Sequence, residues 1–371
     1  MAQLHVLVMP KMGLSMTEGM VARWLKGVGE QVASGEEVAE IETSKITAAY
    51  ESPAHGTLRR QIVAPGVMVP VGAPIGVIAE SGAGEAEADE AAIDAFIAAR
   101  EADFADVQTK AAPPPAPRTV ATEIGPLQVL EAGPEAAPPL VLIHGFGGDL
   151  GNWMFLQPLL AERFRTLAID LPGHGGSTKT LAGANIPALA RAVAAFLRAE
   201  GIGCAHLVGH SLGGAVALAL AAEALSLSLI APAGLGPEIN MDYISGFIAA
   251  RRARQLQPVL GLLFADPSLV GREMVEGVLR YKRIDGVEAA LQAIAAANFA
   301  AGRQSGAFRA TLEAIRVPTL IVWGEDDRII PVAHADALPA SVRVVRFPAT
   351  GHMAHMERAA DLARLIMETA R

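Results

Sequence analysis

The segment Gly209-His210-Ser211-Leu212-Gly213 constrains the fold of this chain more than any other. It follows the apolar run 205–208 and precedes an apolar stretch that predicts a helix. A serine flanked by glycines at a sharp strand-to-helix turn is typical of a nucleophile elbow, in which the hydroxyl stands above a sheet. The segment therefore predicts a reactive Ser211 at the end of a sheet strand.

From about residue 119, short apolar runs alternate with helical stretches, which predicts a mostly parallel sheet. Ligands of such sheets bind beyond the carboxyl ends of the strands, where the polar motifs of this region fall. The expected strands lie at 140–143, 165–169, 205–208, 225–230, 319–323 and 342–345.

A nucleophilic serine needs a base, and the base needs a carboxylate that orients it. The chain order serine, acid, histidine is satisfied by Asp327 in Trp-Gly-Glu-Asp-Asp and by His352 in Thr-Gly-His-Met. Asp326 competes for the role of the acid, and His355 competes weakly for the role of the base. Each motif follows an expected strand, so a Ser211–His352–Asp327 triad is the prediction.

With His-Gly-Phe-Gly-Gly at 144–148 and Asp-Leu-Pro-Gly-His-Gly at 170–175, residues 120–371 resemble the α/β-hydrolase fold. The resemblance implies that the acid is the third residue after Gly324, which favours Asp327. It assigns His144, His174 and His210 to structural turns rather than to catalysis. It also implies an oxyanion hole made by the backbone N–H groups of Phe146 and Leu212, and a helical cap at about 235–310.

One connection in this region departs from the resemblance. Only Ala-Ala-Glu-Ala-Leu-Ser, at 221–226, separates the helix after the nucleophile from the next strand, which is shorter than usual. The cap also carries two basic runs, 251–254 and 280–283. These can contact the phosphates of coenzyme A, or they can be ordinary solvated surface.

Residues 1–80 read as short strands at 5–8, 19–24, 38–42 and 76–79 that are punctuated by glycines, and residues 28–35 are echoed by 64–72. Two such halves predict a small flattened β-sandwich with Lys45, in Glu-Thr-Ser-Lys-Ile, midway between them. This segment resembles the lipoyl domain of 2-oxo-acid and acetoin dehydrogenase complexes. The related biotin carriers place methionines beside the lysine, whereas Ser44 and Ile46 stand here. The resemblance implies lipoate attached covalently to Lys45; the alternative is an ordinary exposed lysine.

Residues 81–118 predict an acidic and then proline-rich flexible linker between a first domain at 1–80 and a second at 119–371. Residues 93–97 suggest a short amphipathic helix, and 111–117 a stiff polyproline-like spacer. The linker contains no basic helical module of the kind that binds peripheral subunits in common acyltransferase components.

Composition narrows the function classes. The chain has 371 residues, a net charge of −9 and one cysteine, Cys204, which is expected in the core. A disulfide within the chain and a thiolate zinc cluster are excluded, no metal site is expected, and a cytoplasmic location is favoured. The acidic charge argues against nucleic acid and anionic membrane as partners. No apolar run reaches the roughly 18 residues of a membrane span, and the first residues do not resemble a signal peptide.

A lipoyl domain joined to an α/β-hydrolase resembles the acetyltransferase component of acetoin dehydrogenase complexes. The resemblance implies two partners, a thiamine-diphosphate-dependent enzyme that cleaves acetoin and a dihydrolipoamide dehydrogenase, with coenzyme A as acyl acceptor. The common acyltransferase motif His-x-x-x-Asp-Gly is missing. The only Asp-Gly pair is Asp285-Gly286, and the residue four positions before Asp285 is Tyr281 rather than histidine. Transfer through Ser211 is therefore the hypothesis. The alternatives are a serine thioesterase or esterase with an attached lipoyl domain, and a non-catalytic lipoyl carrier.

Overall fold

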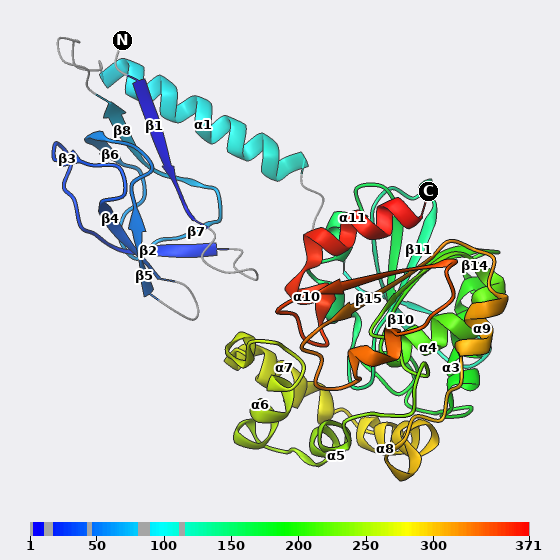
Figure 1. The fold of residues 1–371 in the computed structure, drawn as a ribbon. Helices are drawn as coiled ribbons and strands as arrows, with labels where there is room; N and C mark the ends of the chain where they lie inside the picture. The colour runs from blue at the N-terminus through cyan, green and yellow to red at the C-terminus, as the bar shows by residue number, and fades with distance from the viewer. Residues whose placement is uncertain (1–2, 11–17, 43–46, 81–89, 111–115, 371) are drawn as a thin grey trace. The chain divides into compact units, whose positions relative to one another are not determined.

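The computed structural model describes residues 3–10, 18–42, 47–80, 90–110 and 116–370. The chain forms two compact units, residues 1–114 and 115–371, coloured blue to cyan and cyan-green to red in Figure 1. Each unit has its own buried apolar core. The expected fold class is confirmed, an all-β unit followed by an α/β-hydrolase unit.

Two four-stranded antiparallel sheets build the first unit, in the orders β1-β8-β6-β3 and β5-β4-β2-β7. Alternate side chains of the strands, including Leu7, Val21 and Ile41, form a fully buried core. The strands are β1 (Gln3–Val8), β2 (Glu18–Trp24), β3 (Gln31–Val32), β4 (Glu37–Glu42), β5 (Thr47–Glu51), β6 (Gly56–Gln61), β7 (Met68–Pro70) and β8 (Pro74–Glu80).

Gly56 shows why the sequence around it is so restricted. It adopts φ +147°, and a Cβ at this position would lie 2.3 Å from the Ala79 carbonyl oxygen on the neighbouring strand β8. A side chain would therefore collide with backbone that cannot move without breaking the sheet. Only glycine can begin β6 so close to β8.

Helix α1 (Glu90–Lys110) is longer than the short helix expected near residues 93–97. It packs on β1 and β8, and Ile93 is completely buried. The Arg60 guanidinium donates to the carboxylates of Glu90 and Asp94 at 2.8 and 2.9 Å. The start of α1 therefore belongs to the first unit, although it lies within the segment expected to be a linker.

An eight-stranded sheet in the order β16-β15-β14-β13-β11-β12-β10-β9 forms the centre of the second unit. Strand β10 pairs antiparallel with both of its neighbours, β9 and β12, and all the other strand pairs of this sheet are parallel. The strands are β9 (Arg118–Val120), β10 (Leu127–Ala132), β11 (Pro139–Ile143), β12 (Arg165–Ile169), β13 (Ala205–His210), β14 (Ala224–Ile230), β15 (Thr319–Gly324) and β16 (Val342–Phe347).

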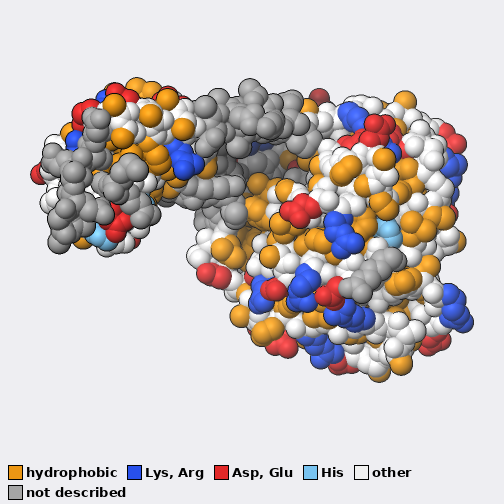
Figure 2. Space-filling view, turned by 90° about the horizontal axis from the view of Figure 1, so that it is seen from above, with side chains coloured by type: hydrophobic (Ala, Val, Ile, Leu, Met, Phe, Trp, Pro, Cys, Tyr) orange, Lys and Arg blue, Asp and Glu red, His pale blue; other side chains and the backbone are white. Residues whose placement is uncertain are grey.

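The sheet is apolar on both faces because helices cover both. Leu140 and Leu142 of β11 join the core on one face, whereas Val141 and Ile143 join the core on the other. The first face is covered by α2 (Gln157–Leu160) and α11 (Ala359–Thr369), and the second by α3 (Ile186–Ala199) and α4 (Leu212–Ala219). Outside these layers, Figure 2 shows basic, acidic and apolar side chains interspersed on one face of the second unit.

A helical cap lies between β14 and β15, at the lower edge of this unit in Figure 1. It contains α5 (Met241–Ala249), α6 (Ala253–Gly261), α7 (Arg272–Lys282) and α8 (Val287–Asn298). The remaining helices are α9 (Arg309–Ala314), α10 (Ala354–Glu357) and the 3-10 helices η1 (Leu150–Trp153), η2 (Ala221–Glu223), η3 (Pro267–Leu269), η4 (Ala300–Gly302) and η5 (Val332–Ala335).

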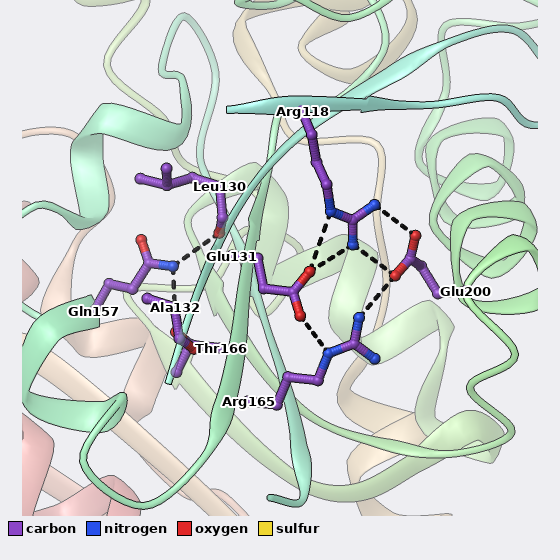
Figure 3. Close-up of polar contacts among 8 residues, drawn as sticks. All are labelled: Arg118, Leu130, Glu131, Ala132, Gln157, Arg165, Thr166 and Glu200. Carbon is purple, nitrogen blue, oxygen red and sulfur yellow. Dashed lines mark hydrogen bonds and ion pairs between the residues drawn. The ribbon is translucent and has the colours of Figure 1, made fainter. Parts of the chain in front are cut away.

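Four charged side chains hold together the edge where the chain enters the second unit (Figure 3). Arg118 of β9 donates to Glu131 of β10 and to Glu200 at the end of α3. Arg165 of β12 donates to the same two glutamates at 2.5 and 2.9 Å. The network joins three strands and a helix, so the first residues of this unit are firmly anchored.

Two local features of the second unit are the position of Cys204 and the short connection after α4. Cys204 is exposed rather than buried, because it lies in the turn just before β13 and not in the strand itself. The short connection after the nucleophile helix is accommodated by an α4 of only 8 residues, followed directly by η2 and β14. The sheet keeps its parallel pairing across this connection.

Candidate active site

Ser211 stands between β13 and α4 in a backbone conformation that serine rarely adopts, with φ 53° and ψ −117°. A Cβ at Gly209 would lie 2.4 Å from the Gly213 carbonyl oxygen, and one at Gly213 would lie 2.1 Å from that of Ile143. Both glycines are therefore required for the turn. Such strain costs about 1–3 kcal/mol and is typically kept only where it holds a functional group in place.

His352 and Asp327 are brought together from two loops after β15 and β16. The Nδ1 atom of His352 lies 2.7 Å from Oδ2 of Asp327, and both side chains are buried. The ring therefore donates its Nδ1–H to the carboxylate and leaves Nε2 free to accept a proton. Asp326, the competing acid, is exposed, and its backbone N–H donates to the Thr350 carbonyl.

The Asp327 carboxylate is held by several donors besides His352. Its Oδ1 accepts the backbone N–H groups of Ile329 and Ile330 at 2.8 and 3.0 Å. Its Oδ2 also accepts the indole N–H of Trp323 at 3.1 Å. These bonds stabilise the ionised carboxylate and fix its orientation toward the imidazole. Sequence reasoning did not identify Trp323 as a support, although it lies only four residues before Asp327.

A stack of buried rings lies behind His352. The centroid of His210 is 4.6 Å from that of His352 and 4.4 Å from that of His355, and Nε2 of His210 donates to the His352 carbonyl at 3.0 Å. Burial, together with His352, lowers the pKa of His355 to about 3. His355 is therefore a neutral packing group, and neither of its ring nitrogens has a hydrogen-bond partner in the described part of the chain.

His144 and His174 hold the backbone of the loop beside the nucleophile, in agreement with their expected structural role. His144 accepts the Leu171 N–H at Nε2 and donates from Nδ1 to the Gly145 carbonyl. His174 accepts the Gly147 N–H at Nε2, 3.2 Å away. Burial lowers the pKa of His174 well below its usual value, so the ring stays neutral and can accept this bond.

The two residues expected to supply an oxyanion hole are both close to Ser211 along the chain or in space: Leu212 follows it directly, and Phe146 follows Gly145, which packs against it. Leu212 begins α4, and the first N–H groups of a helix have no acceptor within the helix. Gly145 packs against Ser211, since a Cβ on Gly145 would lie 3.0 Å from the serine Cβ. The Gly145 carbonyl accepts the Gly148 N–H, so the planar peptide directs the Phe146 N–H the opposite way.

Helix α5 of the cap packs against the loop that contains Phe146, the residue expected in the oxyanion hole. The Tyr243 hydroxyl lies 3.4 Å from the Phe146 carbonyl, and a Cβ on Gly147 would lie 2.5 Å from the Phe247 ring. The Phe146 ring meets those of Phe247 and Phe299 edge to face. Ser211 itself is only 7% exposed, and surroundings of low dielectric constant strengthen charge interactions inside such a site.

The described residues bring no three His, Cys, Asp or Glu side chains together as a metal site would need. Lys45 lies outside the described residues. Its flanks are described, because Glu42 of β4 pairs with Thr47 of β5 in an antiparallel ladder. The two strands that precede and follow the lysine in the sequence thus pair with each other.

Two family models divide the chain as the structure does. The model described as a biotin-requiring enzyme matches residues 5–78, and the model described as an alpha/beta hydrolase fold matches residues 138–359. Among solved structures, a bacterial membrane phospholipase A is 28% identical, with a TM-score of 0.61 over 76% of this chain and 94% of that one. A meta-cleavage product hydrolase from Pseudomonas fluorescens is 19% identical, with a TM-score of 0.62 over 68% of this chain and 96% of that one.

Fold and site together define a carrier domain of the biotin/lipoyl type joined to a domain of the α/β-hydrolase class. Two curated relatives resemble the chain along nearly its whole length, covering 97% of it and 96% of themselves. They are 45% and 43% identical and come from Pseudomonas putida and Cupriavidus necator. The chain belongs to their family, the dihydrolipoyllysine-residue acetyltransferase components of acetoin cleaving systems. None of the helices in the described part of the chain is long and apolar enough to span a membrane.

Proposed function

We propose that this protein receives an acetyl group on lipoyl-Lys45 and transfers it to coenzyme A through Ser211, with His352 as base and Asp327 as its orienting acid. The observation that carries the proposal is the strained serine and the buried His352–Asp327 pair in a chain related over its length to acetyltransferase components. Lys45 would hold the lipoyl group, which would supply a thiol able to carry the acetyl group.

In the first half of the reaction, His352 Nε2 takes the proton of the Ser211 hydroxyl as its oxygen attacks the thioester carbonyl. The N–H groups of Phe146 and Leu212 hold the oxygen that becomes negative. His352 then returns the proton to the departing thiolate. Ser211 is left as an acetyl ester, and the thiol is released intact.

In the second half, His352 accepts the proton of the coenzyme A thiol while the sulfur attacks the acetyl-serine carbonyl. The bond between the acetyl group and Ser211 breaks, and the serine oxygen recovers its proton from His352. Each half therefore returns the triad to its starting protonation state. Transfer rather than hydrolysis requires that the coenzyme A thiol reach the acetyl-serine before water does.

The donor and the partners follow from the family. The relatives are named as components of acetoin cleaving systems, and the proposal assigns acetyl loading to a thiamine-diphosphate-dependent enzyme that cleaves acetoin. Reoxidation of the dithiol falls to a dihydrolipoamide dehydrogenase. A cytoplasmic location agrees with a chain that has only one cysteine.

The test supplies acetyl-dihydrolipoamide and coenzyme A to the purified protein and quantifies acetyl-CoA and free acetate. The proposal expects acetyl-CoA as the main product. A relative named as 2-hydroxy-6-oxo-6-phenylhexa-2,4-dienoate hydrolase, from Burkholderia cepacia, is 30% identical over 62% of this chain, so hydrolysis is the competing outcome. Free acetate as the main product, formed at the same rate without coenzyme A, would assign a thioesterase instead.

A further inference from the structure

Two basic runs stand out in a chain whose net charge is −9. They are Arg251-Arg252-Ala253-Arg254, where α5 ends and α6 begins, and Arg280-Tyr281-Lys282-Arg283, where α7 ends. The runs are separated by 25 residues of sequence, so sequence alone does not say whether they meet. The structure brings them together in one corner of the cap.

Lys282 is the residue that joins the two runs. Its ammonium donates to the Ala250 carbonyl at 2.5 Å, and also to the carbonyls of Phe247 and Ile248 at the end of α5. Burial and the nearby charge of Arg251 lower the pKa of Lys282 to about 8. The end of α7 therefore lies against the residue that immediately precedes the first run.

Some of these charges are already engaged. Arg251 pairs with Glu288 and donates to the Ile248 carbonyl, and Arg280 lies near enough to Glu276 to lower the pKa of that carboxyl. Arg252, Arg254 and Arg283 are exposed, and no carboxylate of the described residues forms an ion pair with them. Three guanidinium groups are thus available to a ligand.

The backbone adds to the positive character of this corner. Helix α6 has nine residues and begins after Arg252 without a side-chain cap. The first N–H groups of a helix lack intrahelical acceptors and carry partial positive charge. Arginine forks also match the geometry of phosphate oxygens and bind them bidentately. The corner therefore has the chemistry of a phosphate site.

The corner is linked to the candidate active site through a single side chain. The Phe247 ring packs against Gly147 of the oxyanion loop, while Lys282 binds the Phe247 carbonyl and lies 5.1 Å from the centre of its ring. Coenzyme A carries its thiol on a long flexible arm and its phosphates at the opposite end. A phosphate site at the end of α5 suits that shape, because Phe247 of the same helix packs against the loop that approaches Ser211 at Gly145.

We infer that Arg252, Arg254 and Arg283 bind the phosphates of the nucleotide end of coenzyme A while its thiol reaches Ser211. This inference rests on the proposed function, since it names the site of the acceptor. It predicts that the protein distinguishes coenzyme A from pantetheine, which has the same thiol arm but lacks the nucleotide.

The test removes the three free charges in the variant Arg252→Gln/Arg254→Gln/Arg283→Gln. With coenzyme A as acceptor, KM should rise about tenfold or more, because charge-assisted bonds to phosphate are lost, and kcat should change little. With pantetheine, the variant should match the wild type, which also shows that it is folded. The matched control is Arg163→Gln/Arg191→Gln/Arg316→Gln, which removes the same charge from exposed positions outside the cap and should leave both acceptors unaffected.

A binding measurement without turnover completes the test. Adenosine 3′,5′-bisphosphate should bind the wild type saturably in calorimetry, more weakly as salt rises, and at least about tenfold more weakly to the cap variant. Equal KM values for coenzyme A in wild type and cap variant, or equal affinities for the bisphosphate, would overturn the inference. A wild type that binds the bisphosphate yet forms no acetyl-CoA would instead count against the proposed function and leave the phosphate site standing.

Discussion

The candidate reactive groups of the two units stand in different surroundings in the chain. Lys45 falls between β4 and β5 in the sequence, two strands that pair with each other. Ser211, His352 and Asp327 lie in a buried site where strained backbone, two obligatory glycines and a held carboxylate fix each atom. A carrier needs only to offer its amine, because its chemistry comes from the attached group, whereas a nucleophile must be preorganised.

This comparison predicts its largest effect at Ser211. Ser211→Ala should reduce acetyl transfer by several orders of magnitude, because nucleophile and base work as a unit. Lipoylation of Lys45 should be unchanged, as intact-mass analysis after expression in a lipoylating host can show. In the converse variant, Lys45→Arg, the lipoyl mass should vanish while transfer from free acetyl-dihydrolipoamide persists. Normal acetyl-CoA formation by Ser211→Ala would leave only the carrier function.

The next effect separates two neighbouring aspartates. Asp327→Asn should lower kcat by about 10³–10⁴-fold, because the amide no longer orients His352 as a base. Asp326→Asn is the matched control, and it should retain nearly full activity because its side chain is exposed. Steady-state kinetics with acetyl-dihydrolipoamide and coenzyme A measure both. If Asp326→Asn were the more damaging change, the role of the acid would pass to Asp326.

The order of motifs made much of the second unit predictable. Six of its eight strands and the three residues of the candidate triad could be named, since short apolar runs ending in polar motifs mark parallel strands. Strand β9 at the edge of the sheet and β10 beside it were missed, because partly exposed strands lack a continuous apolar run. The exposure of Cys204 was missed too, because a turn residue next to a strand shares its local composition.

The first unit was harder to predict strand by strand. Its expected strands correspond to β1, β2, β4 and β8, while β3, β5, β6 and β7 were not located. Strands as short as β3 and β7 hold too few residues to show an alternating pattern. The length of α1 could not be predicted either, since its start is held by Arg59 and Arg60, some thirty residues earlier in the chain.

A third effect tests whether the units cooperate through their connection. Cleavage at a protease site inserted near residue 115 should leave each unit folded, because each has its own core. Transfer from the acetylated first unit should then slow at micromolar concentration and recover as more of that unit is added, since a tether supplies an effective concentration in the millimolar range. An undiminished rate at micromolar dilution would show that the connection does not couple them.

The smallest effects concern stability, and here the two units should again differ. Glu200 is 11% exposed and accepts bonds from Arg118 and Arg165, whereas Glu90, at the start of α1, is 60% exposed. Glu200→Gln should lower the unfolding free energy of the second unit by about 1–3 kcal/mol, because charge-assisted bonds are lost. Glu90→Gln should cost the first unit at most about 1 kcal/mol, as for other exposed ion pairs.

In a Trp24→Phe background, tryptophan fluorescence during a urea titration reports the unfolding of the second unit alone. The two remaining tryptophans, Trp153 and Trp323, are buried in that unit. The bond from Arg118 lowers the pKa of Glu200 in the folded protein below the ordinary 4.5. The stabilisation is therefore present above about pH 4.5 and is lost as the pH falls through the lower, folded-state pKa. The difference between wild type and Glu200→Gln should accordingly be largest near neutral pH and shrink in acid. A difference that stays constant down to acid pH would mean that Glu200 stabilises the edge through packing rather than through its charge.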